Sequence, residues 1–126
     1  MREIVLRAWD KNKKKYIDFI EINFKQKYIR TRDEKMYCPT EVILEQYTGL
    51  YDKNGQEIYE GDVVKLHVVI LSPDDKVGYI EYRPKFGYCI NFGKSIARQE
   101  YWAANDKHTI EVIGNIHENP ELLEGK

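Results

Sequence analysis

The sequence predicts a mainly β protein, and three features of its pattern support this fold class. Apolar and polar residues alternate with a period of two in several short runs, as in half-buried strands. β-branched and aromatic residues are frequent in these runs, most clearly at residues 63–71 (VVKLHVVIL). Clusters of Gly, Pro, Asn and Asp separate the runs at short intervals. Six or more short strands in this arrangement predict a small, partly open barrel of SH3 type, with irregular loops and a short C-terminal helical turn.

The chain of 126 residues is long enough for one modest core, which predicts a single domain over residues 1–126. Its 20 Lys and Arg residues nearly balance 21 Asp and Glu residues, so a site for nucleic acid must be a local patch. The first residues lack a signal-peptide pattern, and no apolar run approaches the roughly 20 residues of a membrane span. We therefore expect a cytoplasmic protein without membrane contact. Cys38 and Cys89 are expected to be free thiols there, although their positions leave a disulfide open.

The first part of the chain predicts strands over residues 2–9 and 15–24, joined by a turn at 10–13. Residues 25–33 (KQKYIRTRD) carry the densest positive charge of the chain. They predict a solvated loop or an edge strand, where positive side chains discourage association between sheets. Residues 41–46 fit a short strand or one helical turn, and we favour the strand.

The central stretch, residues 47–66 (YTGLYDKNGQEIYEGDVVKL), predicts two reversals of the chain. Asp52, Asn54 and Gly55 compose a tight turn, because Asn and Gly accept positive φ and the Asp side chain can bond the backbone ahead. A hairpin is therefore expected around this turn. A second turn at residues 60–62 leads into the strand at 63–71.

The second half of the chain continues with short strands and ends in a helix start. It predicts turns at 72–76 and 83–87, strands at 77–82, 88–92 and 109–116, and a meander formed by the first two of these strands with 63–71. Residues 94–108 predict a long loop with one helical turn or short strand. Gly114 indicates a bulge or a close backbone approach. Asn119 and Pro120 suit the start of a terminal helical turn, with the Asn side chain accepting its free N–H groups. The predicted core consists of Val64, Leu66, Val68, Ile80, Ile90, Val112 and Ile116.

Three segments of the chain resemble the YopX family of small phage and prophage proteins. They are REIVLRAWD at residues 2–10, YTGLYDKNGQEIYEGDVV at 47–64 and EVIGNIHENPELL at 111–123, in the order found in that family. Together they cover about a third of the chain. The resemblance implies a mainly β, SH3-like barrel and a phage or prophage origin in a bacterial host. It implies no activity and no catalytic residue, because the family has none assigned.

Two clusters of interleaved aromatic and basic residues form the candidate binding surface. Such interleaving suits single-stranded nucleic acid or a partner protein, because bases stack on aromatic rings and phosphates pair with cations. The competing interpretation is that the tyrosines cover the ends of the barrel with their hydroxyl groups in water. The candidate residues are Lys25, Lys27, Tyr28, Arg30, Tyr82, Arg83, Lys85 and Phe86.

Patterns for catalysis, metals and cofactors are weak in this sequence. Three acidic residues around Gly61 would serve as acid and base only if burial separated their pKa values, and acids at an exposed turn are ordinary. These residues are Glu57, Glu60 and Asp62. Neither serine, Ser72 or Ser95, lies in a nucleophile elbow, and the glycines form no phosphate-binding loop. The spacing typical of zinc sites is absent among His67, His108, His117, Cys38 and Cys89. We predict no cofactor, no metal and no catalytic residue.

Three hypotheses for the function follow. The first is a non-catalytic binding module, encoded by a phage or prophage, that acts on a host or phage macromolecule in the bacterial cytoplasm. An RNA-processing enzyme is the alternative, by analogy with small barrels in toxin systems. A self-associating structural protein is the third, through an exposed strand edge at residues 68–71. Salt-sensitive binding, turnover and an oligomeric mass would distinguish the three.

Overall fold

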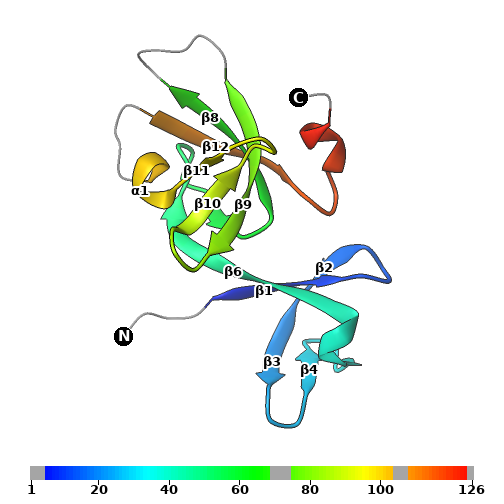
Figure 1. Ribbon diagram of the computed structural model, residues 1–126. Helices are drawn as coiled ribbons and strands as arrows, with labels where there is room; N and C mark the ends of the chain where they lie inside the picture. The colour runs from blue at the N-terminus through cyan, green and yellow to red at the C-terminus, as the bar shows by residue number, and fades with distance from the viewer. Residues whose placement is uncertain (1–4, 69–74, 104–107, 125–126) are drawn as a thin grey trace. The chain divides into compact units, whose positions relative to one another are not determined.

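The computed structural model describes residues 5–68, 75–103 and 108–124, and within them the chain is mainly β, as predicted (Figure 1). No helix among these residues is long and apolar enough to cross a membrane. The strands are β1 Leu6–Asp10, β2 Lys15–Ile17, β3 Phe19–Asn23, β4 Tyr28–Thr31, β5 Met36–Tyr37, β6 Val42–Tyr51, β7 Glu57–Tyr59, β8 Asp62–Val68, β9 Lys76–Arg83, β10 Gly87–Asn91, β11 Ile96–Ala97 and β12 His108–Asn115. The short helical turns are η1 Pro39–Glu41, α1 Gln99–Trp102 and η2 Pro120–Leu123.

The chain groups into two compact units, residues 1–46 and residues 47–126. Strand β6 contributes to both, because its first half pairs with β1 and its second half pairs with β7. Each unit has its own cluster of buried apolar side chains. A single domain over residues 1–126 stays a prediction.

In the first unit, the strand predicted over residues 15–24 is two strands in two sheets. Strand β2 pairs with β1, whereas β3 pairs with β4. The chain changes sheet at Asp18, whose carbonyl oxygen accepts the N–H of Arg32 at 3.1 Å and whose carboxylate pairs with the Arg32 guanidinium at 2.8 Å. The prediction of one strand was wrong because its two halves have different neighbours. This also explains why neither face of the stretch is purely apolar.

Strand β4 occupies a different place from the one predicted for the basic stretch at residues 25–33. Lys25 and Lys27 lie in an exposed turn, as expected for a solvated loop. The expected edge strand was wrong, because β4 is the central strand of a three-stranded sheet of order β3-β4-β5. Ile29 accounts for the difference, since its side chain is fully buried in the apolar cluster of this unit. A central position gives that side chain cover that an edge would not.

The second unit contains a five-stranded antiparallel sheet that curls into a half-barrel (Figure 1). Its strand order is β11-β10-β9-β8-β12, which confirms the predicted meander in β8, β9 and β10. Burial of each large apolar side chain in its core contributes about 1.5–3 kcal/mol. Of the predicted core, Val64, Leu66, Ile80 and Ile90 are buried, Val112 and Ile116 are half-buried, and the side chain of Val68 lies outside the described part.

The stretch at residues 94–108 contains both elements that the sequence left open, a short strand and one helical turn. Trp102, in α1, is 4% exposed and packs into the core of the second unit. Its indole Nε1 donates to the carbonyl oxygen of Tyr88 at 2.9 Å. A buried indole with its N–H satisfied fixes α1 against β10.

Strand β8 is not an edge strand, because it lies between β9 and β12. Val68 pairs with His108 of β12. The exposed edge predicted at residues 68–71 was therefore wrong at Val68. Residues 69–71, and residues 72–74 of the predicted turn that follows, lie outside the described part of the chain.

The predicted hairpin around residues 52–55 is confirmed, since Tyr51 of β6 pairs with Glu57 of β7. Gly55 and Gly61 have φ values of +82° and +84°, which glycine adopts without strain. Residues 41–46, for which a strand was favoured, begin with the last residue of η1 and continue as β6. The central stretch therefore supplies the two reversals that the sequence predicts.

The end of β12 confirms the bulge expected at Gly114, and the close neighbour of this glycine is a side chain and not backbone. The pairing of β12 with β8 shifts register between Val112 and Gly114, and a Cβ on Gly114 would lie 2.5 Å from Oδ1 of Asn119. The terminal turn η2 forms with Pro120 at its start, as predicted. The expected capping by Asn119 was wrong, because its side-chain oxygen accepts the N–H of Asn115 at 3.2 Å instead.

Candidate nucleic-acid interface

The eight predicted binding residues form two clusters, one in each unit. Lys25, Lys27, Tyr28 and Arg30 belong to the β3–β4 hairpin. In that hairpin the Tyr28 hydroxyl and the Arg30 Nε each donate to a carboxylate oxygen of Glu21 at 3.0 Å. The hydrogen bond from Arg30 holds the pKa of Glu21 below its ordinary value, so this carboxylate is charged and neutralises part of the cluster.

The second cluster lies at the β9–β10 hairpin, and all four of its predicted members are exposed. Tyr82 and Arg83 end β9, whereas Lys85 and Phe86 form the turn. The N–H of Phe86 donates to the carbonyl oxygen of Arg83 at 2.9 Å and closes the turn. Arg83 also donates to Glu81 at 2.6 Å, so its charge is partly used within the protein. Lys85 and Phe86 are therefore the members best placed to meet a ligand.

A contact between β10 and α1 brings Arg98 to this hairpin. Gly87 has a φ of +75°, and a Cβ there would collide with the side-chain oxygen of Gln99. The same oxygen accepts the N–H of Tyr88 at 2.9 Å, which ties the start of α1 to the hairpin. As a result, the Arg98 guanidinium carbon lies 5.2 Å from the centroid of the Phe86 ring. This is cation–π geometry.

Arg98 is shared by two hollows on the surface of the second unit. The first has a volume of about 220 Å³ and is lined by Lys85, Phe86, Arg98 and Glu100. The second has a volume of about 340 Å³ and is lined by Leu66, Lys76, Phe92, Ser95, Ile96, Ala97, Arg98 and Tyr101. In the second hollow the Lys76 Nζ lies 5.8 Å from the centroid of the Phe92 ring. We call the set Lys76, Lys85, Phe86, Phe92, Arg98 and Tyr101 the Arg98 surface.

The Arg98 surface combines three cations with three aromatic rings. Rings accept stacked bases of any sequence, and cations beside them pair with phosphates, so this chemistry suits single-stranded nucleic acid. One acid opposes it, because Glu100 lies 3.6 Å from an Arg98 nitrogen. Both side chains are more than half exposed, which makes this ion pair weak and easily exchanged for a phosphate.

Of the Arg98 surface, sequence reasoning identified two members and missed the other four. It identified Lys85 and Phe86 and missed Lys76, Phe92, Arg98 and Tyr101. Arg98 and Tyr101 lie in the stretch at residues 94–108, which shows no period. The signal that could have found them is composition, because this stretch has the same mixture of basic and aromatic residues as residues 82–86. Adjacency in space, however, depends on the Gln99 contact, which no sequence pattern reveals.

Other candidate chemistry finds little support in the described residues. Asp62 is buried, and its carboxylate accepts the N–H of Tyr59 at 2.8 Å, whereas Glu57 is exposed on β7. Within residues 5–68, 75–103 and 108–124, no three His, Cys, Asp or Glu side chains gather as a metal site. Cys38 is an exposed free thiol and Cys89 a buried one, and burial raises the pKa of Cys89.

Comparison with known proteins places this chain in a family. The family model described as YopX protein matches residues 6–124. The chain belongs to the YopX family.

Two solved structures resemble this YopX-family chain over nearly their whole lengths. Protein EF1440 from Enterococcus faecalis is 26% identical, with a TM-score of 0.69, and the match covers 98% of this chain and 100% of that one. Protein yopX from Bacillus subtilis is 19% identical, with a TM-score of 0.65, and the match covers 100% of this chain and 99% of that one. No curated protein matches.

Each of the three YopX-like segments contains a buried Asp or Asn that closes a strand end. Asp10 ends β1 and accepts the N–H groups two and three residues ahead at 2.9 and 3.0 Å. Asp52 follows β6 and accepts the N–H groups of Asn54 and Gln56, each at 2.9 Å. Asn115 ends β12 and accepts the N–H groups two and three residues ahead at 3.0 and 2.9 Å. The family segments therefore share a mechanism for ending strands.

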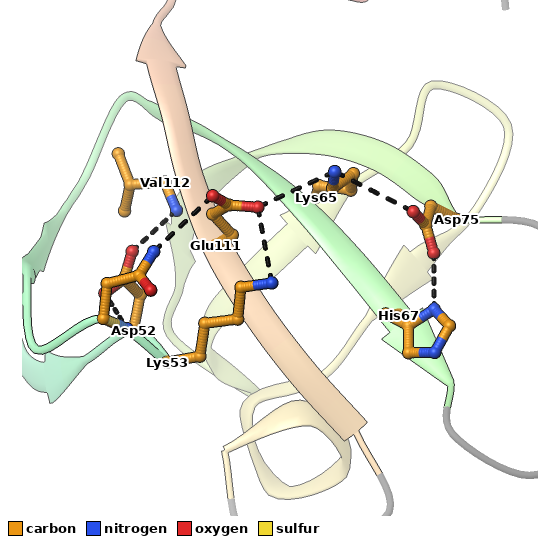
Figure 2. A network of polar contacts seen from close by, with 8 residues as sticks. Asp52, Lys53, Lys65, His67, Asp75, Glu111 and Val112 are labelled. Carbon is orange, nitrogen blue, oxygen red and sulfur yellow. Dashed lines mark hydrogen bonds and ion pairs between the residues drawn. The ribbon is translucent and has the colours of Figure 1, made fainter.

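Asp52 also accepts the N–H of Val112 from β12 at 3.0 Å, which fastens the β6–β7 turn to the far end of the half-barrel sheet (Figure 2). Burial by itself raises the pKa of Asp52. The hydrogen bonds from three backbone N–H groups together lower it by more, so the pKa lies below its ordinary value. Beside it, the N–H of Lys53 donates to the carbonyl oxygen of Ile110 at 2.9 Å.

Charged side chains extend this contact along β8 and β12 (Figure 2). Glu111 lies 3.6 Å from the Nζ of Lys53 and 3.6 Å from the Nζ of Lys65. The Nζ of Lys65 also lies 3.9 Å from one carboxylate oxygen of Asp75. The other carboxylate oxygen of Asp75 lies 2.6 Å from Nδ1 of His67. Asp52, Lys53 and Glu111 of the YopX-like segments thus bond or pair with groups of the protein itself, whereas the Arg98 surface presents its cations to solvent.

Proposed function

We propose that this YopX-family protein is a non-catalytic binding module that holds single-stranded nucleic acid on the Arg98 surface. The observation that carries the proposal is the position of Arg98 between two hollows, each of which contains a lysine and an aromatic ring. A strand crossing Arg98 can stack bases on Phe86 and Tyr101 while its phosphates meet the cations. A phage or prophage origin and action in the bacterial cytoplasm are parts of the same proposal.

Binding of a labelled oligo(U) or oligo(dT), followed by fluorescence anisotropy, tests this proposal. The dissociation constant of the wild type is expected to rise steeply with salt, because phosphate contacts release counterions. Arg98→Gln and Phe86→Ala are each expected to weaken binding about tenfold, since stacking and cation–π contacts are worth roughly 1–3 kcal/mol. Lys53→Gln is the matched control, because it removes one exposed charge outside both hollows.

Two outcomes would overturn the proposal. Equal weakening by Arg98→Gln and Lys53→Gln, with no effect of Phe86→Ala, would reflect net charge and not the Arg98 surface. Binding that no variant changes would place the nucleic acid elsewhere on the chain. Gel analysis of the bound RNA and the mass in solution test the rival hypotheses, because a binding module leaves the RNA intact, and a self-associating protein exceeds 15.0 kDa.

A further inference from the structure

A pocket in the first unit has an excess of positive charge in its lining. We propose that this pocket binds a phosphate group with two negative charges, either free phosphate or the phosphate of a phosphomonoester. Its volume is about 280 Å³, and the β1–β2 and β4–β5 turns both contribute to its lining. The charged lining residues are Lys13, Lys15, Asp18, Arg32, Asp33 and Lys35. The site belongs to a different unit from the Arg98 surface, and it does not rest on the proposed function.

The carboxylates of this pocket are already engaged by neighbouring side chains. Asp18 pairs with Arg32 at 2.8 Å. Asp33 accepts the hydroxyl of Thr31 and lies 3.8 Å from the Nζ of Lys35. The hydrogen bond from Thr31 lowers the pKa of Asp33, so this acid is charged. Four cations against two carboxylates leave an excess of two positive charges in the lining.

Two of these cations reach the pocket from different turns, Lys13 from the β1–β2 turn and Lys35 from the β4–β5 turn. The interaction with Lys35 lowers the pKa of Lys13. Two ammonium groups in one pocket repel each other, and an anion bound between them would reduce the repulsion.

The backbone holds Lys13 in place through Asp10. The N–H of Lys13 donates to the Asp10 carboxylate at 3.0 Å, and the N–H of Lys14 donates to its carbonyl oxygen at 2.8 Å. Asp10 is 1% exposed, so these bonds are protected from water. Lys14 has a φ of +56°, in the left-handed region that residues other than glycine rarely adopt.

The second turn holds Lys35 in the same manner. The N–H of Lys35 donates to the Thr31 hydroxyl oxygen at 3.0 Å, and the carbonyl oxygen of Lys35 accepts the N–H of Thr31 at 2.9 Å. Glu34, between them, has a φ of +66°. Strained backbone of this kind persists where the surrounding structure over-determines it, and it concentrates at ligand sites. The backbone of both lysines is therefore fixed at the pocket before any ligand arrives.

Charge and size together select the ligand class. A phosphate or phosphomonoester with two negative charges balances the excess of two positive charges, whereas a phosphodiester brings only one. A lysine pair suits such an anion because ammonium groups act as point charges toward phosphate. The pocket also exceeds the size of a phosphate, and two aromatic residues, Tyr16 and Tyr37, are part of its lining.

Titration of the full chain with three probes, followed by the NMR signals of the lysine side chains, tests this site. The probes are inorganic phosphate, a nucleoside 5′-monophosphate and dimethyl phosphate, at one ionic strength set with sodium chloride. Saturable shifts of Lys13 and Lys35 are expected with the first two probes, and dimethyl phosphate should bind about tenfold more weakly because it carries one charge. Comparison of the first two probes shows whether the esterified group adds affinity.

Variants of single lysines locate the bound anion. Lys13→Gln and Lys35→Gln are each expected to weaken phosphate binding about tenfold, because each removes one ammonium from the pair. Lys25→Gln is the matched control in the same unit, since Lys25 lies in the exposed β3–β4 turn outside the pocket. Arg98→Gln should leave phosphate binding unchanged, which separates this site from the proposed function. Backbone NMR spectra of each variant confirm that it is folded.

The pKa of Lys13 supplies a further readout. It would not change on addition of phosphate if Lys13 had only a structural role. The ionisable groups that act on the Lys13 amine are Lys35, Lys15 and Asp10. Bound phosphate should raise the pKa of Lys13 toward its ordinary value, because the anion favours the protonated amine. An unchanged pKa at saturation, undiminished binding by Lys13→Gln, or equal shifts with chloride alone would each overturn the proposal.

Discussion

Asp52 and Arg98 are charged residues next to turns of the same unit, yet the protein uses them in opposite ways. Asp52 is 6% exposed, and three backbone N–H groups donate to its carboxylate. The Arg98 side chain is 54% exposed and contacts Phe86 and Glu100, two other side chains that face solvent. The difference indicates that the recognisable YopX segment maintains the fold, while the proposed binding chemistry lies in a stretch without a motif.

Among the substitutions that test this comparison, Asp52→Ala should have the largest effect on stability. It leaves the N–H groups of Asn54, Gln56 and Val112 without their acceptor, and hydrogen bonds to a charged group are the strong ones. We expect a loss of about 3 kcal/mol in the free energy of unfolding, measured by urea denaturation. Glu57→Ala, at an exposed acid of the same hairpin, is the control and should change stability by about 0.5 kcal/mol or less. Equal losses in both variants would contradict the anchoring role of Asp52.

Gly114→Ala is expected to cost about 2 kcal/mol, because the added Cβ would lie 2.5 Å from the Asn119 side-chain oxygen. The clash displaces the hydrogen bond between Asn119 and the N–H of Asn115. Thermal unfolding of Gly114→Ala, of Asn119→Ala and of the double variant measures the coupling. Asn119→Ala removes the side-chain oxygen and the Cγ, at 2.5 and 2.8 Å from the added Cβ, but keeps its own Cβ at 2.9 Å. It relieves part of the clash, so it should cost less in the Gly114→Ala background than alone. Simple additivity of the two losses would show that the close approach is not the cause.

The dependence of stability on pH gives a smaller effect, seen as a difference between the wild type and Asp52→Asn. The pKa of Asp52 is lower in the folded protein than the value of about 3.9 in the unfolded chain. Its contribution is therefore fully present above about pH 3.9 and is lost as the pH falls through the folded pKa. The advantage of the wild type over Asp52→Asn should shrink as the pH falls from 5 to about 2.5. An advantage that stays constant would mean that the charge of Asp52 does not matter.

Local sequence patterns are sufficient for the parts of the fold that depend on local order. Alternation predicts the meander of β8, β9 and β10, and the composition of residues 52–55 predicts a turn in which Asp52 bonds the backbone ahead. The third bond of Asp52, to Val112, lies beyond such reasoning because its donor is 60 residues later in the chain. The break at Asp18 could not be predicted from local patterns either, because one extended run of the sequence is divided between two sheets.

The same distinction between local and long-range order applies to the residues of the candidate site. Lys85 and Phe86 could be predicted because they are neighbours in a turn of basic and aromatic composition. Arg98 could not, because β11 and α1 are two and four residues long and too short to show a period. The contact between Gln99 and the N–H of Tyr88 brings Arg98 to Phe86. A surface assembled in this way becomes visible only when the strands are paired.

Phe86→Ala should produce the smallest change in stability. It therefore tests most directly whether folding and binding depend on different residues. Phe86 is 38% exposed in the β9–β10 turn, and its N–H bond to Arg83 survives truncation of the side chain. We expect the free energy of unfolding to change by about 0.5 kcal/mol or less, as for other surface positions. The same variant should weaken binding of oligo(U) about tenfold. A protein that folds as well as the wild type but binds poorly would separate the two roles, whereas a large loss of stability would place Phe86 with Asp52 among the residues that hold the fold together.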